Sequence, residues 1–236
     1  MPADKAPARG PSVIEPEPPF AGPIFGDRID LARSYVSILV RDSDRLGLLG
    51  PREFSKIWSR HVAHCAILAS ELDQVAPPNP SGLGFSNSTS GGDCLDIGSG
   101  AGLPGIPLAI ALPARHFTLL EPMERRAAWL RATVNELGLS NVDVLRERAE
   151  EHRKKYRIVT ARAVAPLRNL ITLAEPLLSQ DSQSAGLFIK GQNAAAEIAE
   201  AGKVIQRMNR GHPQLLILGR ELGADSLTVV RIQRSE

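Results

Sequence analysis

The chain has 236 residues, of which 43% are hydrophobic and 23% charged, a composition typical of a globular protein with a sizeable core. No apolar run approaches the roughly eighteen residues that cross a bilayer, and the first residues lack the apolar segment of a secretion signal, so we expect no membrane association. The two cysteines, Cys65 and Cys94, exclude a disulfide framework and a cysteine-based zinc site, and both stand in apolar sequence, which favours a reduced, cytoplasmic protein.

Basic residues are concentrated in one stretch, although the net charge of +2 is itself uninformative. Between residues 115 and 168, twelve lysines and arginines outnumber seven acidic residues. This stretch is either a solvated helical surface or a basic surface that suits a phosphate backbone, and the sequence leaves both open. The basic residues are Arg115, Arg125, Arg126, Arg131, Arg146, Arg148, Arg153, Lys154, Lys155, Arg157, Arg162 and Arg168.

Proline content and periodicity divide the chain into four parts. Residues 1–20 contain six prolines and almost no apolar periodicity, which predicts a disordered tail. Residues 21–74 are expected to form two helices that pack on the core, the second beginning at Pro51. Residues 75–92, rich in Pro, Ser and Gly, predict a flexible loop, and residues 93–236 predict the core domain. The apolar positions at helical spacing are Ile29, Ala32, Val36 and Leu39 in the first helix, and Phe54, Ile57, Trp58, His61, Cys65, Leu68 and Leu72 in the second.

From residue 93 onward, apolar runs of strand length alternate with helical stretches. Five strands linked by helices are expected to run parallel, whereas the last two runs are joined by a short turn at Gly223 and should be antiparallel neighbours. The pattern predicts an α/β fold with a doubly wound, mostly parallel, seven-stranded Rossmann-like sheet and an N-terminal helical extension. The expected strands are one that carries Asp96 near its end, then 117–120, 142–145, 158–161, 187–189, 215–218 and 227–232; the expected helices lie at 104–112, 123–137, 166–178 and 193–209.

A glycine-rich loop follows the first core strand directly, with glycines at Gly98, Gly100, Gly102 and Gly105. Glycine adopts positive φ and has no Cβ, so such a loop turns sharply and lets a ligand approach the backbone. About twenty residues further on, the second strand ends in Glu121, an acid suited to bind ribose hydroxyls. Strand, glycine loop, helix, strand and acid together predict a nucleoside-binding unit.

Two residues favour a cationic nucleoside over a dinucleotide. The segment 100–105 matches G-x-G-x-x-G, which is also the pattern of NAD(P)-dependent dehydrogenases. However, the Asp96 carboxylate would repel a pyrophosphate, and Pro104 removes one of the N–H groups that such an anion uses. S-adenosylmethionine (SAM) is cationic and has no phosphate, so we expect Asp96, the glycine loop and Glu121 to bind it. Alternatively, Asp96 is a turn acid and Glu121 a helix N-terminal acid.

The glycine loop continues in a pattern more specific than its glycines. Residues 95–108 read Leu-Asp-Ile-Gly-Ser-Gly-Ala-Gly-Leu-Pro-Gly-Ile-Pro-Leu and resemble the signature of the glucose-inhibited division protein B family, the small-subunit ribosomal RNA methyltransferases G. The resemblance covers roughly residues 26–232, with departures in the N-terminal helices at 46–51 and 64–65. Further matching segments are Trp58-Ser59-Arg60-His61, Leu119-Leu120-Glu121-Pro122, Arg148-Ala149-Glu150-Glu151, Arg162-Ala163-Val164-Ala165 and Lys190-Gly191.

The resemblance implies SAM-dependent methylation of guanine N7 in the decoding-region loop of small-subunit ribosomal RNA. Guanine N7 has a free lone pair and no proton, so the reaction needs no general base and can depend on positioning. The implied partner is the small ribosomal subunit or its 16S-type rRNA, and a monomer is the default expectation. The implied cofactor residues are Asp96, Gly98, Gly100, Leu103, Glu121, Ala149, Glu150 and Arg162, and the implied catalytic residues are Arg162, Lys190 and Arg148.

Three other functions stay open at this stage. A methyltransferase for a small molecule or a protein would make no use of the basic stretch. An NAD(P)-dependent oxidoreductase would prefer a nicotinamide cofactor. A non-catalytic RNA-binding protein could keep the same fold, because fold does not determine function.

Overall fold

The computed structural model describes residues 13–76, 93–180, 183–207 and 211–233. Its strands are β1 (Cys94–Ile97), β2 (Phe117–Leu120), β3 (Val142–Leu145), β4 (Ile158–Arg162), β5 (Ala185–Lys190), β6 (Gln214–Leu218) and β7 (Leu227–Gln233). They form one sheet with the order β3-β2-β1-β4-β5-β7-β6. The strands β1 to β5 pair in parallel, and β7 pairs antiparallel with β5 and β6. The predicted mostly parallel seven-stranded sheet is therefore confirmed.

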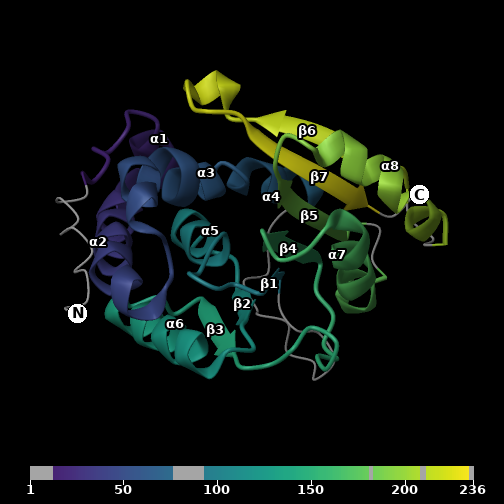
Figure 1. The fold of residues 1–236 in the computed structure, drawn as a ribbon, viewed down its shortest axis with the longest axis horizontal. Coiled ribbons are helices and arrows are strands. Elements are labelled where there is room, and N and C mark those ends of the chain that lie inside the picture. Colours follow the sequence, from purple (N-terminus) through teal and green to yellow (C-terminus); the bar gives the residue numbers. More distant parts are fainter. Residues whose placement is uncertain (1–12, 77–92, 181–182, 208–210, 234–236) are drawn as a thin grey trace, which may run out of the picture.

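Helices cover both faces of this sheet (Figure 1). The α-helices are α1 (Ala21–Phe25), α2 (Ile29–Leu46), α3 (Val62–Ala66), α4 (Ala69–Val75), α5 (Gly105–Ala111), α6 (Glu124–Glu136), α7 (Leu167–Ala174) and α8 (Ala194–Arg207), with short 3-10 helices η1 (Gly26–Arg28), η4 (Glu175–Leu177) and η5 (Arg220–Leu222). Helices α1 to α6 share one hydrophobic cluster with Cys94 and Phe117, while α7 and α8 share a second with Leu95 and Leu120. Successive strand residues point to opposite faces, so every strand except the edge strand β6 contributes to both clusters.

The connection between β3 and β4 differs from the expectation that helices link all five parallel strands. Residues 146–157 contain no helix. Their sequence is polar and basic, without the apolar periodicity that would bury a helix on the sheet. The buried His152 organises this connection instead, because its ring contacts Glu147 at 2.6 Å and the hydroxyl of Tyr156 at 2.9 Å.

The second predicted N-terminal helix is broken into four pieces. A 3-10 helix η2 (Pro51–Lys56) and a π-helix η3 (Ile57–His61) precede α3 and α4. The predicted apolar stripe is nevertheless buried along its whole length. The break follows from competing hydrogen bonds at η3. The N–H groups of Trp58 and Ser59 donate to the Glu15 carboxylate, and the carbonyl of Arg60 accepts from Arg162.

Of the tail predicted over residues 1–20, the structure describes residues 13–20. Within the described residues, Glu15 N donates to Phe54 O at 2.9 Å, its carboxylate binds η3, and Phe20 is buried. These contacts join two residues of the predicted tail, Glu15 and Phe20, to the N-terminal helices. Residues 1–12, and residues 77–92 of the predicted loop, lie outside the described residues.

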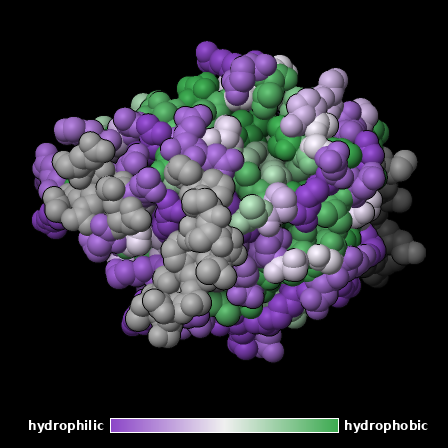
Figure 2. Space-filling view, turned by 180° about the vertical axis from the view of Figure 1, so that it is seen from behind, coloured by the Kyte–Doolittle hydropathy of each residue, from purple (hydrophilic) through white to green (hydrophobic). Residues whose placement is uncertain are grey.

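Polar residues dominate the rim of the molecule, and apolar residues reach the surface between them. In the view opposite to Figure 1, green apolar groups emerge in the middle and upper part of the face (Figure 2). The edge strand β6 contributes the partly exposed side chains of Leu215 and Ile217. None of the described helices combines the length and apolar character that a membrane span requires.

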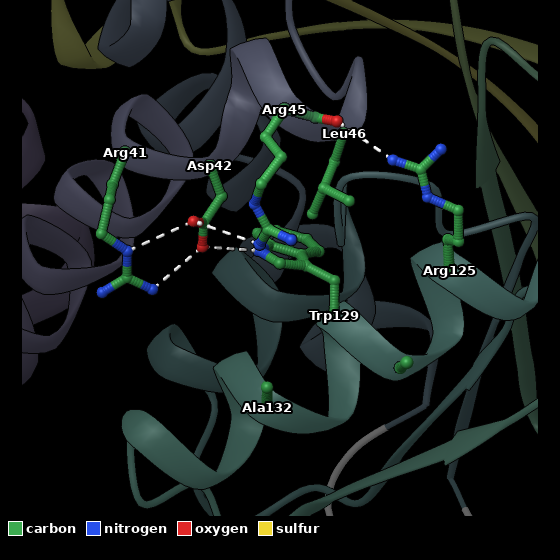
Figure 3. A pocket seen from close by; sticks show the side chains of 8 residues that line it. Arg41, Asp42, Arg45, Leu46, Arg125, Trp129 and Ala132 are labelled. Atoms are coloured by element: carbon green, nitrogen blue, oxygen red, sulfur yellow. Dashed lines mark hydrogen bonds and ion pairs between the residues drawn. The ribbon is translucent and has the colours of Figure 1, made fainter.

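A buried aspartate fixes α2 to α6. Asp42 on α2 accepts hydrogen bonds from Trp129 Nε1 on α6 at 3.0 Å and from Arg41 Nη2 at 2.9 Å (Figure 3). Arg45 and Arg125 complete the rim of a pocket of about 430 Å³ between the two helices. Arg125 Nη2 also donates to the carbonyl of Arg45 at 3.1 Å, so this part of the basic stretch supports the end of α2. The pocket includes no residue of the glycine loop.

We expect Asp42→Asn to lower the free energy of unfolding by about 1 kcal/mol at pH 7. The hydrogen bond from Arg41 lowers the pKa of Asp42 below its usual value of 3.8. A lowered folded-state pKa stabilises the protein above the unfolded pKa, and this stabilisation is lost as pH falls through the folded value. Urea unfolding of wild type and variant should therefore differ at pH 7 and converge towards pH 3.

Asp30→Asn is the matched control, because Asp30 lies on the same helix in an exposed ion pair with Arg33. It should cost roughly 0.3–0.5 kcal/mol or less. An Asp42→Asn cost that is the same at both pH values would contradict the assignment.

Candidate functional site

The glycine loop leaves β1 at the carboxyl end of the sheet and turns back at once. Gly98, Gly100 and Gly102 have φ values of 65°, 57° and 82°, a region that favours glycine. The loop then starts α5 at Gly105, where a Cβ would collide with the Leu119 side chain and lie 2.8 Å from Asp96 Oδ2. The backbone at Gly105 therefore lies so close to β1 and β2 that a residue with a Cβ would not fit there.

Asp96 supports the loop from below. It is fully buried, and its Oδ2 accepts hydrogen bonds from Ser99 Oγ at 2.7 Å and Gly105 N at 3.1 Å. Its Oδ1 has no hydrogen-bond partner among the described residues. Burial raises the pKa of Asp96 to about 7, with a further contribution from the nearby Glu121, although its two hydrogen bonds act in the opposite direction.

Glu121 holds the loop from the neighbouring strand. It is buried at the end of β2, and its Oε2 accepts a hydrogen bond from Gly100 N at 2.9 Å while Oε1 accepts from Met123 N at 2.8 Å. The structure thus brings together Glu121 and the glycine loop, as the sequence predicted. Leu103 is also buried within the loop, where its N–H donates to Ser99 O.

Tyr35 on α2 is a loop contact that the sequence analysis missed. Its buried hydroxyl donates to Ala101 O at 2.5 Å and lies 3.0 Å from the position of a Cβ on Gly102. The residue stands beside the predicted apolar stripe of its helix. A tyrosine on a buried helix face needs a partner for its hydroxyl, and this requirement was the available signal.

Arg162 lies at the end of β4, next to the glycine loop. The pairing of β1 with β4 ends at Asp96↔Thr160, and beyond it a Val164 side-chain carbon lies 3.0 Å from the position of a Cβ on Gly98. The residue between Arg162 and Val164, Ala163, has a positive φ of 54°. The guanidinium of Arg162 points into the N-terminal helices and donates to three acceptors there, namely Cys65 Sγ at 3.0 Å, Arg60 O at 3.0 Å and His61 Nδ1 at 2.8 Å.

Lys190 lies at the end of β5 and supports the chain that follows Arg162. Its Nζ donates to Ala165 O at 3.1 Å and forms an ion pair with Glu197 at 2.7 Å. The same carboxylate accepts from Leu167 N at 2.6 Å. The Lys190 side chain is only 9% exposed, so here it orders the segment after β4 rather than projecting into solvent.

Arg148, Ala149 and Glu150 follow β3 at the same edge. Glu121 N donates to Leu145 O at 3.1 Å, which ties the end of β2 to the start of this segment. Arg148 and Glu150 are exposed and Ala149 is half-buried. The predicted site residues from β1 to β5 therefore all lie along the carboxyl edge of the sheet, where ligands of open α/β sheets bind.

Carboxyl groups surround the glycine loop at this edge of the sheet. Two buried carboxylates bracket the glycine loop, and they disfavour a pyrophosphate there. Among the described residues, no group of three or more His, Cys, Asp or Glu side chains is arranged to hold a metal ion.

Comparison with known proteins identifies the family. Residues 28–220 match the sequence profile of a family described as rRNA small subunit methyltransferase G. The chain belongs to this family. A relative named ribosomal RNA small subunit methyltransferase G from Pseudarthrobacter chlorophenolicus is 44% identical over 211 residues, which are 89% of each chain. The relative of the same name from Clavibacter michiganensis is 41% identical, with coverage of 94% of this chain and 97% of its own.

Solved structures support the Rossmann-like fold of this rRNA small subunit methyltransferase G family member. A protein from Corynebacterium glutamicum matches with a TM-score of 0.53 and 19% identity, covering 86% of this chain and 90% of its own. Magnesium protoporphyrin IX methyltransferase from Synechocystis, solved with bound SAM, matches with a TM-score of 0.50 and 14% identity over 85% of this chain and 97% of its own.

We expect Gly105→Ala to lower the free energy of unfolding by about 1–3 kcal/mol, because the added methyl group displaces Leu119 or the Asp96 carboxylate. Gly202→Ala is the matched control. Gly202 lies inside α8 with open space around its Cβ position, so this change should stabilise the protein by roughly 0.5–1 kcal/mol. Urea unfolding measures both, and equal effects of the same sign would contradict the close approach at Gly105.

Proposed function

We propose that the protein transfers a methyl group from SAM to N7 of a guanine in the decoding-region loop of small-subunit ribosomal RNA. Membership of the methyltransferase G family supports the activity on ribosomal RNA. The observation that carries the cofactor assignment is the glycine loop bracketed by the carboxylates of Asp96 and Glu121. The small ribosomal subunit, or its 16S-type rRNA, is the partner, and the reaction takes place in the cytoplasm.

The residues at the carboxyl edge have separate tasks in holding SAM, which supplies an electrophilic methyl group on its sulfonium. Gly98, Gly100 and Leu103 form the wall that the cofactor contacts. Glu121 keeps unused lone pairs on both oxygens, which can accept bonds from ribose hydroxyls. Ala149 and Glu150 flank the adenine. Asp96, beneath the loop, maintains its shape and provides negative charge to a cationic ligand.

The acceptor guanine has to be positioned for the reaction, but it does not have to lose a proton. The lone pair of guanine N7 attacks directly, and holding it in line with the methyl group can contribute roughly 7–11 kcal/mol at the extreme. Arg148 is exposed and suited to a phosphate or to guanine O6. Arg162 and Lys190 act mainly as positioning residues, since their donors order the chain on both sides of the site.

The decisive experiment offers labelled SAM to small ribosomal subunits, to naked 16S-type rRNA and to free nucleosides. Mass spectrometry of the digested RNA should find the label on N7 of one guanine in the decoding-region loop. Label on ribosomal protein alone would make the protein a protein methyltransferase. No transfer to any RNA would overturn the proposal, and preference for a nicotinamide cofactor would indicate an oxidoreductase.

We expect Glu121→Gln to weaken SAM binding about tenfold or more, equal to about 1.4 kcal/mol. The amide nitrogen cannot accept from Gly100 N or Met123 N, so the loop loses a support and the ribose loses an acceptor. Titration calorimetry measures the Kd. Glu124→Gln is the control, because Glu124 is exposed in a surface ion pair, and its Kd should equal that of wild type. Equal Kd values for both variants would contradict the role of Glu121.

A further inference from the structure

We propose that the π-helical turn η3 is part of the RNA-binding surface and presents Arg60 to the phosphodiester backbone beside the target nucleotide. This inference rests on the proposed function, because it takes RNA as the substrate. It concerns residues of the N-terminal extension, outside the core that carries the glycine loop.

The turn is fixed at both of its ends. At its start, the Glu15 carboxylate accepts from Trp58 N at 2.8 Å and Ser59 N at 3.0 Å. At its end, Arg162 donates to Arg60 O and to His61 Nδ1. π-helical turns are rare and are found frequently at functional sites. Here the widened turn leaves backbone groups free for these two partners, so the position of Arg60 is set by contacts from distant parts of the chain.

His61 continues the support from Arg162 to Glu53. An arginine can only donate, so Nδ1 of His61 accepts, and Nε2–H donates to Glu53 Oε2 at 2.7 Å. Burial, and next the charge of Arg162, lower the pKa of His61 to about 4, so the ring is neutral at physiological pH. The neutral ring can accept from Arg162 at Nδ1 and donate to Glu53 at Nε2 at the same time. The chain Arg162–His61–Glu53 therefore holds η3 at the end of β4.

Arg60 itself is the exposed member of this arrangement. Its side chain is 59% exposed, and its ion pair is a long one, 3.5 Å between Nη1 and Glu53 Oε2. That oxygen also accepts from His61, and an exposed ion pair of this length contributes little, so the Arg60 guanidinium is available to a further anion. The backbone carbonyl of Arg60 accepts from Arg162, the last residue of β4, and Val164, two positions further on, contacts the glycine loop at Gly98.

A phosphodiester is the ligand that fits this geometry. The backbone carbonyl of Arg60 is held by Arg162, and its exposed side chain carries a positive charge that a phosphate of the bound strand can meet. The glycine loop places the reacting methyl group at this edge of the sheet. Contacts to phosphate set register and orientation, and this is what a reaction governed by positioning requires.

The test compares Arg60→Ala with Arg52→Ala in the binding of small ribosomal subunits at several salt concentrations. Arg52 is exposed on η2, eight positions before Arg60, and provides a matched loss of charge. We expect Arg60→Ala to weaken binding about tenfold, and its slope of log K against log salt to fall by about 0.7–0.9, the loss of one phosphate contact. Arg60→Lys should keep most of that slope, and Arg52→Ala should match wild type.

Two readouts separate this inference from the proposed function. The Kd for SAM should be unchanged in Arg60→Ala, which shows that the exposed substitution leaves the cofactor site folded. If the wild type binds subunits but transfers no methyl group to RNA, the proposed function fails while the binding comparison still tests Arg60. Equal weakening in Arg60→Ala and Arg52→Ala, or an unchanged salt slope in Arg60→Ala, would overturn the inference.

Discussion

Two buried carboxylates hold the glycine loop from adjacent strands, and the rest of the site depends on them. Asp96 binds the loop where it enters α5, and Glu121 binds it at Gly100. Removing Asp96 would leave the buried N–H of Gly105 unpaired, which is costly, and removing Glu121 would release the N–H groups of Gly100 and Met123. In the proposed function the same two carboxyl groups face the ligand, so the groups that shape the loop would also favour a cation over a pyrophosphate.

The local part of the site could be predicted from the sequence because its residues are close along the chain. The glycines, Asp96 and Glu121 belong to one βαβ unit, whose geometry is largely determined by its connections. The parallel sheet and its antiparallel end followed in the same way from apolar runs and connection length. The residues after Gly102, Leu-Pro-Gly-Ile-Pro-Leu at 103–108, then pointed to one methyltransferase family.

The long-range contacts could not be predicted in that way. Tyr35 reaches a loop 66 positions away, and Arg162 donates to acceptors about a hundred positions before it. Apolar periodicity predicts which face of a helix is buried. It does not predict which hydrogen-bond partner a buried hydroxyl or guanidinium group has on that face. For the same reason the sequence did not show that Lys190, implied as a catalytic residue, donates to Ala165 O and pairs with Glu197. The break at η3 likewise depends on Glu15, outside the helix itself.

The contact of Glu15 with η3 has a practical consequence for shortened versions of the protein. A truncated variant that lacks the proline-rich residues 1–20 would be an obvious design, because it retains every predicted helix. It would lack the carboxylate that accepts from Trp58 N and Ser59 N, so two buried or half-buried peptide groups would lose their partner. Trimming would then loosen η3, and if η3 contacts RNA as proposed, a truncated protein would bind SAM normally and still transfer little methyl to RNA.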